Sequence, residues 1–399
     1  MLYTRKNSFE LIKRLNEPRK FIQIITGPRQ TGKTTMVTIV LDKLETPHLY
    51  ATCDDPEIHD RIWLEQVWER ARRKSADCDN FILVLDEVQK VTNWSETVKM
   101  LWDDDTKHDR KIKLVLLGSS TLLIQKGLTE SLQGRFEIVR STHWTFEEMH
   151  TAFGWDIDTF IQFGGYPGAA SLVSEPERWR HYVVDSLIEP TISKDILQMQ
   201  RIHKPALLRN LFTLGCTYSG QIVSYQKLLG QLQNVGNTTT LAHYLHLLEH
   251  AGLLKGMQKY SPSPIRKRGS SPKFIALNTA LVTVQSIVTG EIKDRRPDIW
   301  GRLVESAAGA HLCNHLQSEP VEVTYWREGN YEVDFVLSVN DAILCVEIKS
   351  GARRSFLPGI GAFEKKFGKV HKLLVGGEGM PLKDFFLMNP FTLFGTLTQ

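Results

Sequence analysis

A short glycine-rich segment near the N-terminus has the residue types of a phosphate-binding loop. Residues 27–34 read Gly-Pro-Arg-Gln-Thr-Gly-Lys-Thr and fit the pattern G-x-x-x-x-G-K-[ST] in full. Glycine lets backbone N–H groups approach a phosphate, and the N-terminus of a following helix favours anions. We expect the Lys33 ammonium to reach the β- and γ-phosphates and the Thr34 hydroxyl to hold Mg²⁺. The predicted nucleotide-binding residues are Gly27, Pro28, Arg29, Gln30, Thr31, Gly32, Lys33, Thr34 and Thr35.

Two adjacent acids follow an apolar run that is typical of a buried strand. The run 81–85 reads Phe-Ile-Leu-Val-Leu and leads into Asp86 and Glu87. In open parallel α/β sheets, ligands bind at the carboxyl ends of the strands. We therefore predict that Asp86 holds Mg²⁺ and that Glu87 polarises the attacking water. The alternative is that these acids only cap a helix.

The next apolar run, residues 113–117, leads into Gly118, Ser119 and Ser120. A polar side chain at this end of the strand can sense the γ-phosphate or orient the water. We predict that role for Ser120, with Ser119 as the other candidate. The alternative is that both serines only begin the next turn.

A second set of chemically competent residues lies near the C-terminus. Asp334 lies in one apolar run, and Glu347 and Lys349 lie two residues apart in the next, so they share one face of a strand. The turn residues 340–341, Asn-Asp, favour a hairpin that brings Asp334 toward Glu347. Two carboxylates can hold a divalent cation, Mg²⁺ or Mn²⁺, while Lys349 positions a hydrolytic water. A surface ion pair of Glu347 with Lys349 is the alternative.

The first 150 residues supply the strands that must position the phosphate-binding residues. The first, third and fourth of five apolar runs are nearly continuous, which predicts strands that are buried on both faces of a parallel α/β sheet. The segments between the runs are long enough for crossover helices. The five runs span residues 21–26, 48–51, 81–85, 113–117 and 136–139.

Residues 206–290 have the pattern of a winged helix-turn-helix. Helical patterns at 206–216, 225–232 and 239–251 precede strand-like runs at 253–260 and 273–277, and residues 251–290 contain no Asp or Glu. An unopposed basic wing suits contacts with DNA phosphates, although winged helices also serve as packing modules between domains. The predicted DNA contacts are Thr238, Thr239, His243, Arg266, Lys267, Arg268 and Lys273.

The bulk properties are those of an ordinary multidomain globular chain. The 399 residues carry a net charge of +4, five scattered cysteines and no apolar run long enough to cross a membrane, so we expect a cytoplasmic protein. We predict a P-loop core, a helical lid or linker, a winged helix and a final α/β domain. Their expected ranges are 1–158, 159–204, 205–292 and 293–399.

These motifs together resemble two known superfamilies. GPRQTGKT, FILVLDE, LLGSS and the segment 131–135 resemble the AAA+ ATPases, more closely the prokaryotic ones fused to a C-terminal domain of uncharacterised function. The resemblance implies that Arg135 completes a neighbouring subunit's active site, and hence a homo-oligomer. The EVDFVL and VEIK segments, with the upstream Glu305, resemble the PD-(D/E)XK nuclease superfamily. That resemblance implies a metal site formed by Glu305, Asp334 and Glu347, although Val333 stands where the superfamily's name has proline.

The sequence therefore predicts an oligomeric, Mg²⁺-dependent ATPase that acts on DNA, with a C-terminal domain that either cleaves DNA or holds it. One rival is a nucleotide-driven signalling or defence switch that binds a protein partner. Another is a DNA-binding regulator in which ATP sets the oligomeric state and the nuclease fold is inactive.

Overall fold

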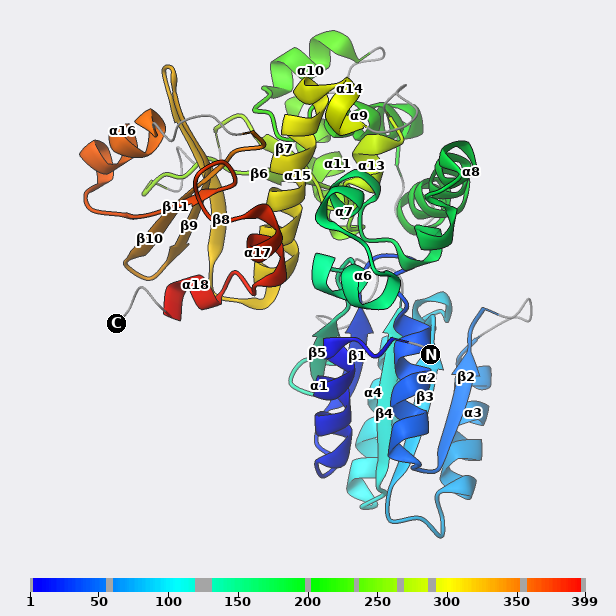
Figure 1. Ribbon diagram of the computed structural model, residues 1–399. Helices are drawn as coiled ribbons and strands as arrows, with labels where there is room; N and C mark the ends of the chain where they lie inside the picture. The colour runs from blue at the N-terminus through cyan, green and yellow to red at the C-terminus, as the bar shows by residue number, and fades with distance from the viewer. Residues whose placement is uncertain are drawn as a thin grey trace. The chain divides into compact units, whose positions relative to one another are not determined.

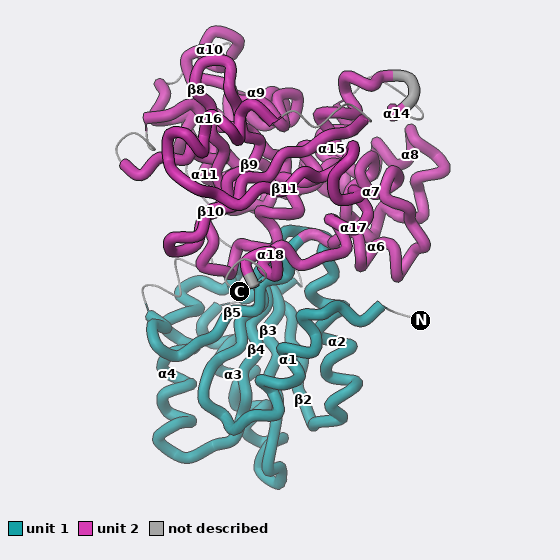
Figure 2. Tube along the Cα trace, turned by 60° about the vertical axis from the view of Figure 1, so that its left-hand side comes forward, with its two compact units in different colours: residues 1–142 teal, residues 143–399 magenta. Residues whose placement is uncertain are grey.

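The computed structural model describes residues 3–54, 60–118, 131–197, 202–232, 237–263, 269–285, 292–351 and 357–395. The chain divides into two units, residues 1–142 and 143–399, which Figure 2 draws in teal and magenta. Among the described residues, each helix is too short or too polar to cross a lipid bilayer.

The five predicted apolar runs form one parallel sheet in the first unit. The strand order is β2-β3-β4-β1-β5, and neighbouring strands pair in parallel throughout. β4 lies between β1 and β3, so the carboxyl ends of these three strands meet at one edge. The strands are β1 (Ile22–Thr26), β2 (His48–Thr52), β3 (Phe81–Asp86), β4 (Ile112–Gly118) and β5 (Phe136–Arg140).

Helices cover both faces of this sheet, which explains why its central strands β1, β3 and β4 are buried on both sides (Figure 1). Side chains alternate between the faces, so Ile24 packs into the core under α3 and α4 while Ile25 packs into the core under α1 and α2. The short 3₁₀ helix η1 (Val88–Lys90) follows β3. The helices are α1 (Lys6–Asn16), α2 (Lys33–Leu44), α3 (Arg61–Lys74) and α4 (Trp94–Lys107).

Helices open the second unit. Thr145 caps the first of them, and its side chain and that of Glu148 form a reciprocal capping box. Phe146 and Ile161 pack in one core with Leu303, so residues 143–158 pack with the C-terminal residues. The first compact unit ends at residue 142, and the predicted ATPase domain of residues 1–158 stays a prediction. The elements are α6 (Phe146–Phe153), α7 (Ile157–Phe163), η2 (Pro167–Leu172), α8 (Pro176–His181) and the π-helical η3 (Tyr182–Ile188) and η4 (Thr191–Leu197).

Three helices and a two-stranded antiparallel hairpin follow, in the order predicted for a winged helix. Leu241, Leu245 and Leu248 are buried, as their helical spacing predicts. The elements are α9 (Pro205–Thr217), α10 (Tyr225–Gln231), α11 (Thr238–His250), β6 (Leu254–Met257), β7 (Lys273–Ala276) and the short α13 (Ala280–Thr283).

The C-terminal part is a four-stranded mixed sheet between helices. Its order is β11-β10-β9-β8, with β10 and β11 parallel and the other pairs antiparallel. The predicted hairpin is present, and its turn residue Asn340 has φ +49°. α15 packs on one face and α16 on the other. The elements are α14 (Ile292–Arg295), α15 (Pro297–His315), η5 (Leu316–Ser318), β8 (Glu322–Glu328), β9 (Tyr331–Val339), β10 (Ala342–Ile348), α16 (Pro358–Phe367), β11 (His371–Val375), α17 (Leu382–Leu387) and α18 (Thr392–Gly395).

Candidate functional site

The loop between β1 and α2 depends on backbone conformations that disfavour most side chains. The φ angle is +153° at Gly27, +58° at Gln30 and +80° at Gly32. A Cβ atom at Gly27 would lie 1.9 Å from the carbonyl oxygen of Ser141, so no other residue fits this close approach. α2 begins at Lys33, directly after the loop. The unpaired N–H groups in the first turn of α2 therefore lie next to the loop, where they can bind an anion.

The side chains of Arg5 and Thr31 hold the loop in place from within the protein. Arg5 donates from Nη1 to the Thr31 carbonyl oxygen at 3.2 Å and to the Ser141 hydroxyl at 2.8 Å. The Thr31 hydroxyl donates to the Pro28 carbonyl oxygen at 3.0 Å, and the residue is fully buried. The Thr31 side chain therefore supports the loop from inside the protein. Sequence reasoning missed Arg5, because no motif connects it with a loop 22 or more residues away.

Lys33 lies against the carbonyl groups of its own loop. Its Nζ donates to Gly27 at 2.9 Å and to Pro28 at 2.7 Å, and the residue is buried. A phosphate offers this ammonium charged acceptors in place of two neutral carbonyls, and charge-assisted hydrogen bonds are stronger. The geometry thus holds Lys33 at the loop, ready to exchange partners when an anion binds.

Thr34 and Asp86 meet at the carboxyl edge of the sheet, as the sequence predicts. The Thr34 hydroxyl donates to Asp86 Oδ2 at 3.0 Å, and the Tyr50 hydroxyl donates to the same oxygen. A hydroxyl beside a carboxylate is the oxygen donor set that Mg²⁺ prefers, so these two residues fit a nucleotide-bound Mg²⁺. Burial and the contact with Asp86 raise the pKa of Tyr50, which keeps this phenol a neutral donor. Tyr50 lies on β2, and only the strand order reveals its proximity to Asp86.

Glu87 follows Asp86 with a left-handed backbone, φ +55°, and its carboxylate accepts from the Gln89 side-chain amide. A non-glycine residue at positive φ often marks a functional site, since the conformation costs free energy.

β4 ends at Gly118 between β1 and β3, which is where Ser119 and Ser120 were expected to act. Both serines lie outside the described residues.

Arg135 lies at the amino ends of the strands, whereas the phosphate-binding loop lies at their carboxyl ends. It precedes β5, and its carbonyl accepts from the N–H of Ile22 at the start of β1. Its guanidinium makes a two-pronged pair with Asp103, from Nε at 2.8 Å and from Nη2 at 3.0 Å. Arg135 is therefore remote from the phosphate-binding loop of its own chain, and its action on a neighbouring subunit stays a prediction.

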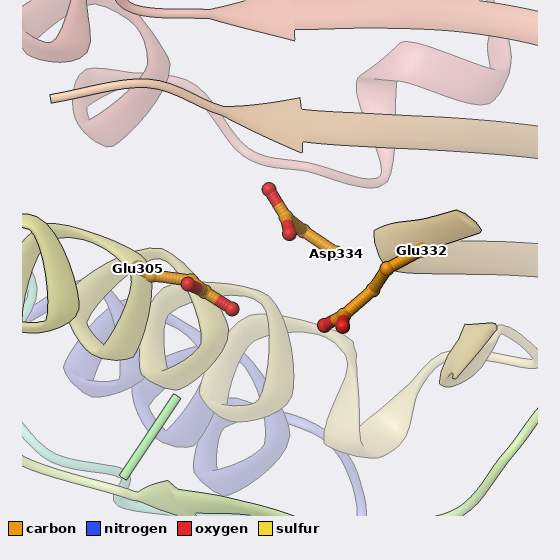
Figure 3. A group of neighbouring side chains, drawn as sticks. All are labelled: Glu305, Glu332 and Asp334. Atoms are coloured by element: carbon orange, nitrogen blue, oxygen red, sulfur yellow. The ribbon is translucent and has the colours of Figure 1, made fainter. Parts of the chain in front are cut away.

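The second candidate site is a carboxylate cluster with a lysine inside it. Figure 3 shows Glu305 from α15 and Glu332 and Asp334 from β9 gathered around one space. One oxygen of each lies within 4.8 Å of the others. Glu332 was missed, although its position two residues before Asp334 on a strand could have revealed it.

Lys273 corrects one of the predicted DNA contacts. Its side chain is 0% exposed, and its Nζ lies 2.5 Å from Glu305 Oε1 and 3.3 Å from Glu332 Oε1. A lysine in this position cannot reach a DNA phosphate. The wing residue that reads as a basic surface group is instead the counter-ion of the acid cluster.

Glu347 and Lys349 lie beside the cluster on β10. Lys349 Nζ donates to Glu347 Oε1 at 2.6 Å, and Asp334 Oδ2 accepts from the Ile348 N–H at 2.8 Å. Burial and the neighbouring Asp334 raise the pKa of Glu347. Asp334 and Glu347 therefore lie on neighbouring strands close to each other, as predicted. The three carboxylates that could share a metal ion, however, are those of Asp334, Glu305 and Glu332.

The proposed recognition helix α11 has an exposed polar side. Thr238, Thr239 and His243 are all exposed, whereas the leucines of the same helix are buried. The wing residues Arg266, Lys267 and Arg268 lie outside the described residues. DNA contact by this helix and by the wing therefore stays a prediction.

Three family models match consecutive segments of the chain. Residues 19–150 match a model described as an AAA domain. Residues 154–290 and 300–390 match two further models, each described as a domain of unknown function. The first match agrees with the parallel five-stranded sheet and supports the AAA prediction for the N-terminal part.

The chain is similar to proteins of a bacterium and an archaeon. The chain is 23% identical to the uncharacterized protein Rv2008c of Mycobacterium tuberculosis over 88% of its own length and 74% of that protein. It is 21% identical to the uncharacterized protein MJ1544 of Methanocaldococcus jannaschii over 79% of its length and 72% of that protein.

Two solved structures show a weaker likeness. The Orc1 protein of Aeropyrum pernix in complex with DNA is 14% identical and covers 71% of this chain and 93% of its own, with a TM-score of 0.34. The RuvB Holliday junction branch migration motor of Thermotoga maritima is 18% identical and covers 67% and 91%, also with a TM-score of 0.34.

Proposed function

We propose that the chain is a Mg²⁺-dependent ATPase whose active site lies at the carboxyl edge of the N-terminal sheet. The main observation that supports this proposal is the 3.0 Å hydrogen bond from the Thr34 hydroxyl to Asp86 Oδ2. This contact lies beside a loop in which three residues have positive φ angles. This contact joins the two halves of an NTP site that the sequence separates by about fifty residues. The match of residues 19–150 to the AAA model supports the same function.

Each residue has a distinct task in this proposal. The N–H groups of the loop bind the β- and γ-phosphates, and the Lys33 ammonium leaves the Gly27 and Pro28 carbonyls to neutralise phosphate charge. Thr34 and Asp86 hold Mg²⁺, which neutralises phosphate oxygens when it is bound. Glu87 orients the attacking water, and its fixed backbone keeps the carboxylate near the Asp86 strand end.

Nucleotide binding tests this proposal directly. Lys33→Ala is expected to lose retention of ATP in the presence of Mg²⁺, measured with a fluorescent ATP analogue. Lys43→Ala is the matched control, because Lys43 lies on the same helix and its described partners, the Thr4 hydroxyl at 3.1 Å and the Phe9 ring, lie outside the loop. A folded wild-type protein that retains no ATP would reject the proposal.

We further propose that this ATPase acts on DNA through the face of α11 that carries Thr238, Thr239 and His243. The absence of acidic residues from 251 to 290 favours an anionic partner over a basic protein surface. The test measures ATP turnover with and without DNA at several salt concentrations. Stimulation that weakens as salt rises supports action on DNA, whereas ATP-dependent capture of a protein without DNA affinity supports the signalling rival.

Cleavage by the C-terminal domain is the finer hypothesis. It predicts DNA scission with Mg²⁺ or Mn²⁺ that is lost in Asp334→Ala and in Lys349→Ala. Activity that survives both changes belongs to another site or to a contaminant. The contact of Lys273 with the carboxylates favours the alternative in which the nuclease-like fold is inactive.

A further inference from the structure

Lys273 has the surroundings of a bound cation. Besides Glu305 and Glu332, its Nζ lies 3.8 Å from Asp334 Oδ1 and donates to the Asp334 carbonyl oxygen at 3.3 Å. The ammonium also lies 5.2 Å from the centre of the Phe335 ring. Three carboxylates and one backbone carbonyl are the hard oxygen donors that a divalent cation selects. The lysine therefore meets the ligand set of a metal ion.

The lysine and the carboxylates stabilise each other. A buried ammonium requires compensation for its lost hydration, and carboxylates in contact repel one another unless a cation lies between them. Burial works to lower the pKa of Lys273, yet the neighbouring carboxylates outweigh it and the pKa lies above its ordinary value. Removing the lysine would leave two half-buried acids and Asp334 without their shared counter-ion.

Backbone contacts hold the lysine in this place. β7 pairs with β6, and Lys273 also bridges to Ile222. The hairpin is fastened to the C-terminal sheet through Tyr325, whose N–H donates to the Gln258 carbonyl at 3.1 Å. The Tyr325 carbonyl accepts from the Tyr260 N–H at 2.6 Å. Withdrawal of Lys273 would have to break this anchoring.

The other predicted ligands are engaged as well. Asp334 accepts from the Ile348 N–H, and Glu347 accepts from Lys349. Each of the four carboxylates in and beside the cluster thus has an ammonium or an N–H partner. The residues do not fit a catalytic divalent metal in this arrangement.

We infer that the Lys273 ammonium takes the place of a divalent cation, so that this nuclease-like fold keeps its carboxylates but binds no metal among them. The wing of the predicted winged helix thereby acts as an internal counter-ion for the C-terminal domain. Replacing Lys273 by an uncharged residue turns the cluster into a divalent-cation site. The inference is independent of whether the N-terminal unit hydrolyses ATP.

The test titrates the full-length protein with Mn²⁺, without nucleotide, and follows free Mn²⁺ by electron paramagnetic resonance. We expect wild-type binding to be weak and unchanged by Asp334→Asn. Lys273→Met is expected to bind Mn²⁺ at least about tenfold more tightly, and Lys273→Met/Asp334→Asn to lose the gain. Lys255→Met is the matched control, since Lys255 lies on the partner strand and pairs with Glu249 away from the cluster.

Two results would overturn the inference. One is tight Mn²⁺ binding by the wild type that Asp334→Asn removes. The other is a folded Lys273→Met protein that binds Mn²⁺ no better than the wild type. If Lys273→Met alone does not fold, Lys273→Met/Glu305→Gln removes one negative charge together with the positive one. That double variant leaves Glu332 and Asp334 as ligands, and the same two outcomes apply to it.

Discussion

Glu87 follows the strand end that carries Asp86, where a carboxylate can orient the attacking water. Its φ of +55° also occurs at the helix-capping residue Asn93, so the charge of Glu87, and not its backbone, is the property to change. Glu87→Gln keeps the shape and removes the charge, so we expect ATP turnover to fall by about 10²–10⁴-fold while ATP binding is retained. Phosphate release and equilibrium nucleotide binding measure the two effects. Equal turnover in the variant and the wild type would remove Glu87 from the mechanism.

Glu305 gives the carboxylate cluster a pH dependence. Burial is the largest cause that raises its pKa, from 4.5 to about 7; Lys273 opposes the rise and Asp334 adds to it. The folded protein therefore binds this proton more tightly than the unfolded chain does. The contribution to stability is present below about pH 4.5 and is lost as pH rises through about 7.

Glu305→Gln removes this titration and isolates its effect. The free energy of unfolding of the wild type, relative to the variant, is expected to fall between pH 5 and 8 by on the order of 1–3 kcal/mol. Denaturant titrations of both proteins at several pH values measure the difference. A difference that rises with pH would contradict the assigned direction of the pKa shift.

At the scale of elements, the phosphate-binding loop depends on the end of β5. A Cβ at Gly27 would lie 1.9 Å from the Ser141 carbonyl oxygen, whereas a Cβ at Gly32 meets no atom within 4 Å. Both residues have positive φ. We expect Gly32→Ala to cost about 1 kcal/mol of conformational free energy, and Gly27→Ala to cost more because backbone must move.

Thermal unfolding of the first unit without nucleotide separates these two costs. The melting temperature of Gly27→Ala is expected to lie clearly below that of Gly32→Ala. Equal melting temperatures would mean that β5 moves away from the loop at no cost, and that the close packing at Ser141 has no role in stability.

Local patterns were sufficient to predict most elements. The five strands of the first unit, the helices of the winged segment and the hairpin of β9 and β10 follow from apolar runs and turn residues within a few positions of each other. The assignment of Thr34 and Asp86 to one Mg²⁺ site also came from the sequence, because a complete motif fixes the loop and a parallel sheet brings strand ends together. The hydrogen bond between the two side chains is seen only in the structure.

Contacts between distant segments were not predictable in this way. Lys273 stands in a basic, acid-free stretch and reads as a wing residue, because its partners lie 32 or more positions later. Burial of a lysine depends on which carboxylates the tertiary fold places around it, and no local pattern carries that information. Arg5 and Tyr50 were missed for the same reason, since strand order and chain packing bring them to the P-loop.

At the scale of the whole molecule, the Arg135 hypothesis requires a neighbouring copy. The pair of Arg135 with Asp103 is largely solvated, so it contributes only about 0–1 kcal/mol to stability. Arg135→Ala is therefore expected to fold and bind ATP but to lose turnover. Asp103→Asn, which breaks the same pair and keeps the arginine, is expected to retain turnover; loss in both variants would assign the pair a structural role.

Mixed oligomers test whether the arginine acts on a neighbour. Arg135→Ala has an intact P-loop site without its arginine, and Glu87→Gln has the arginine beside a disabled site. Co-expressed in equal amounts, the two inactive variants are expected to regain about a quarter of the wild-type turnover, because random neighbours complete one site in four. A mixture of Lys33→Ala with Glu87→Gln should stay inactive, since neither subunit has a complete site. If differently tagged subunits co-purify and the first mixture is still inactive, Arg135 does not act across a subunit interface.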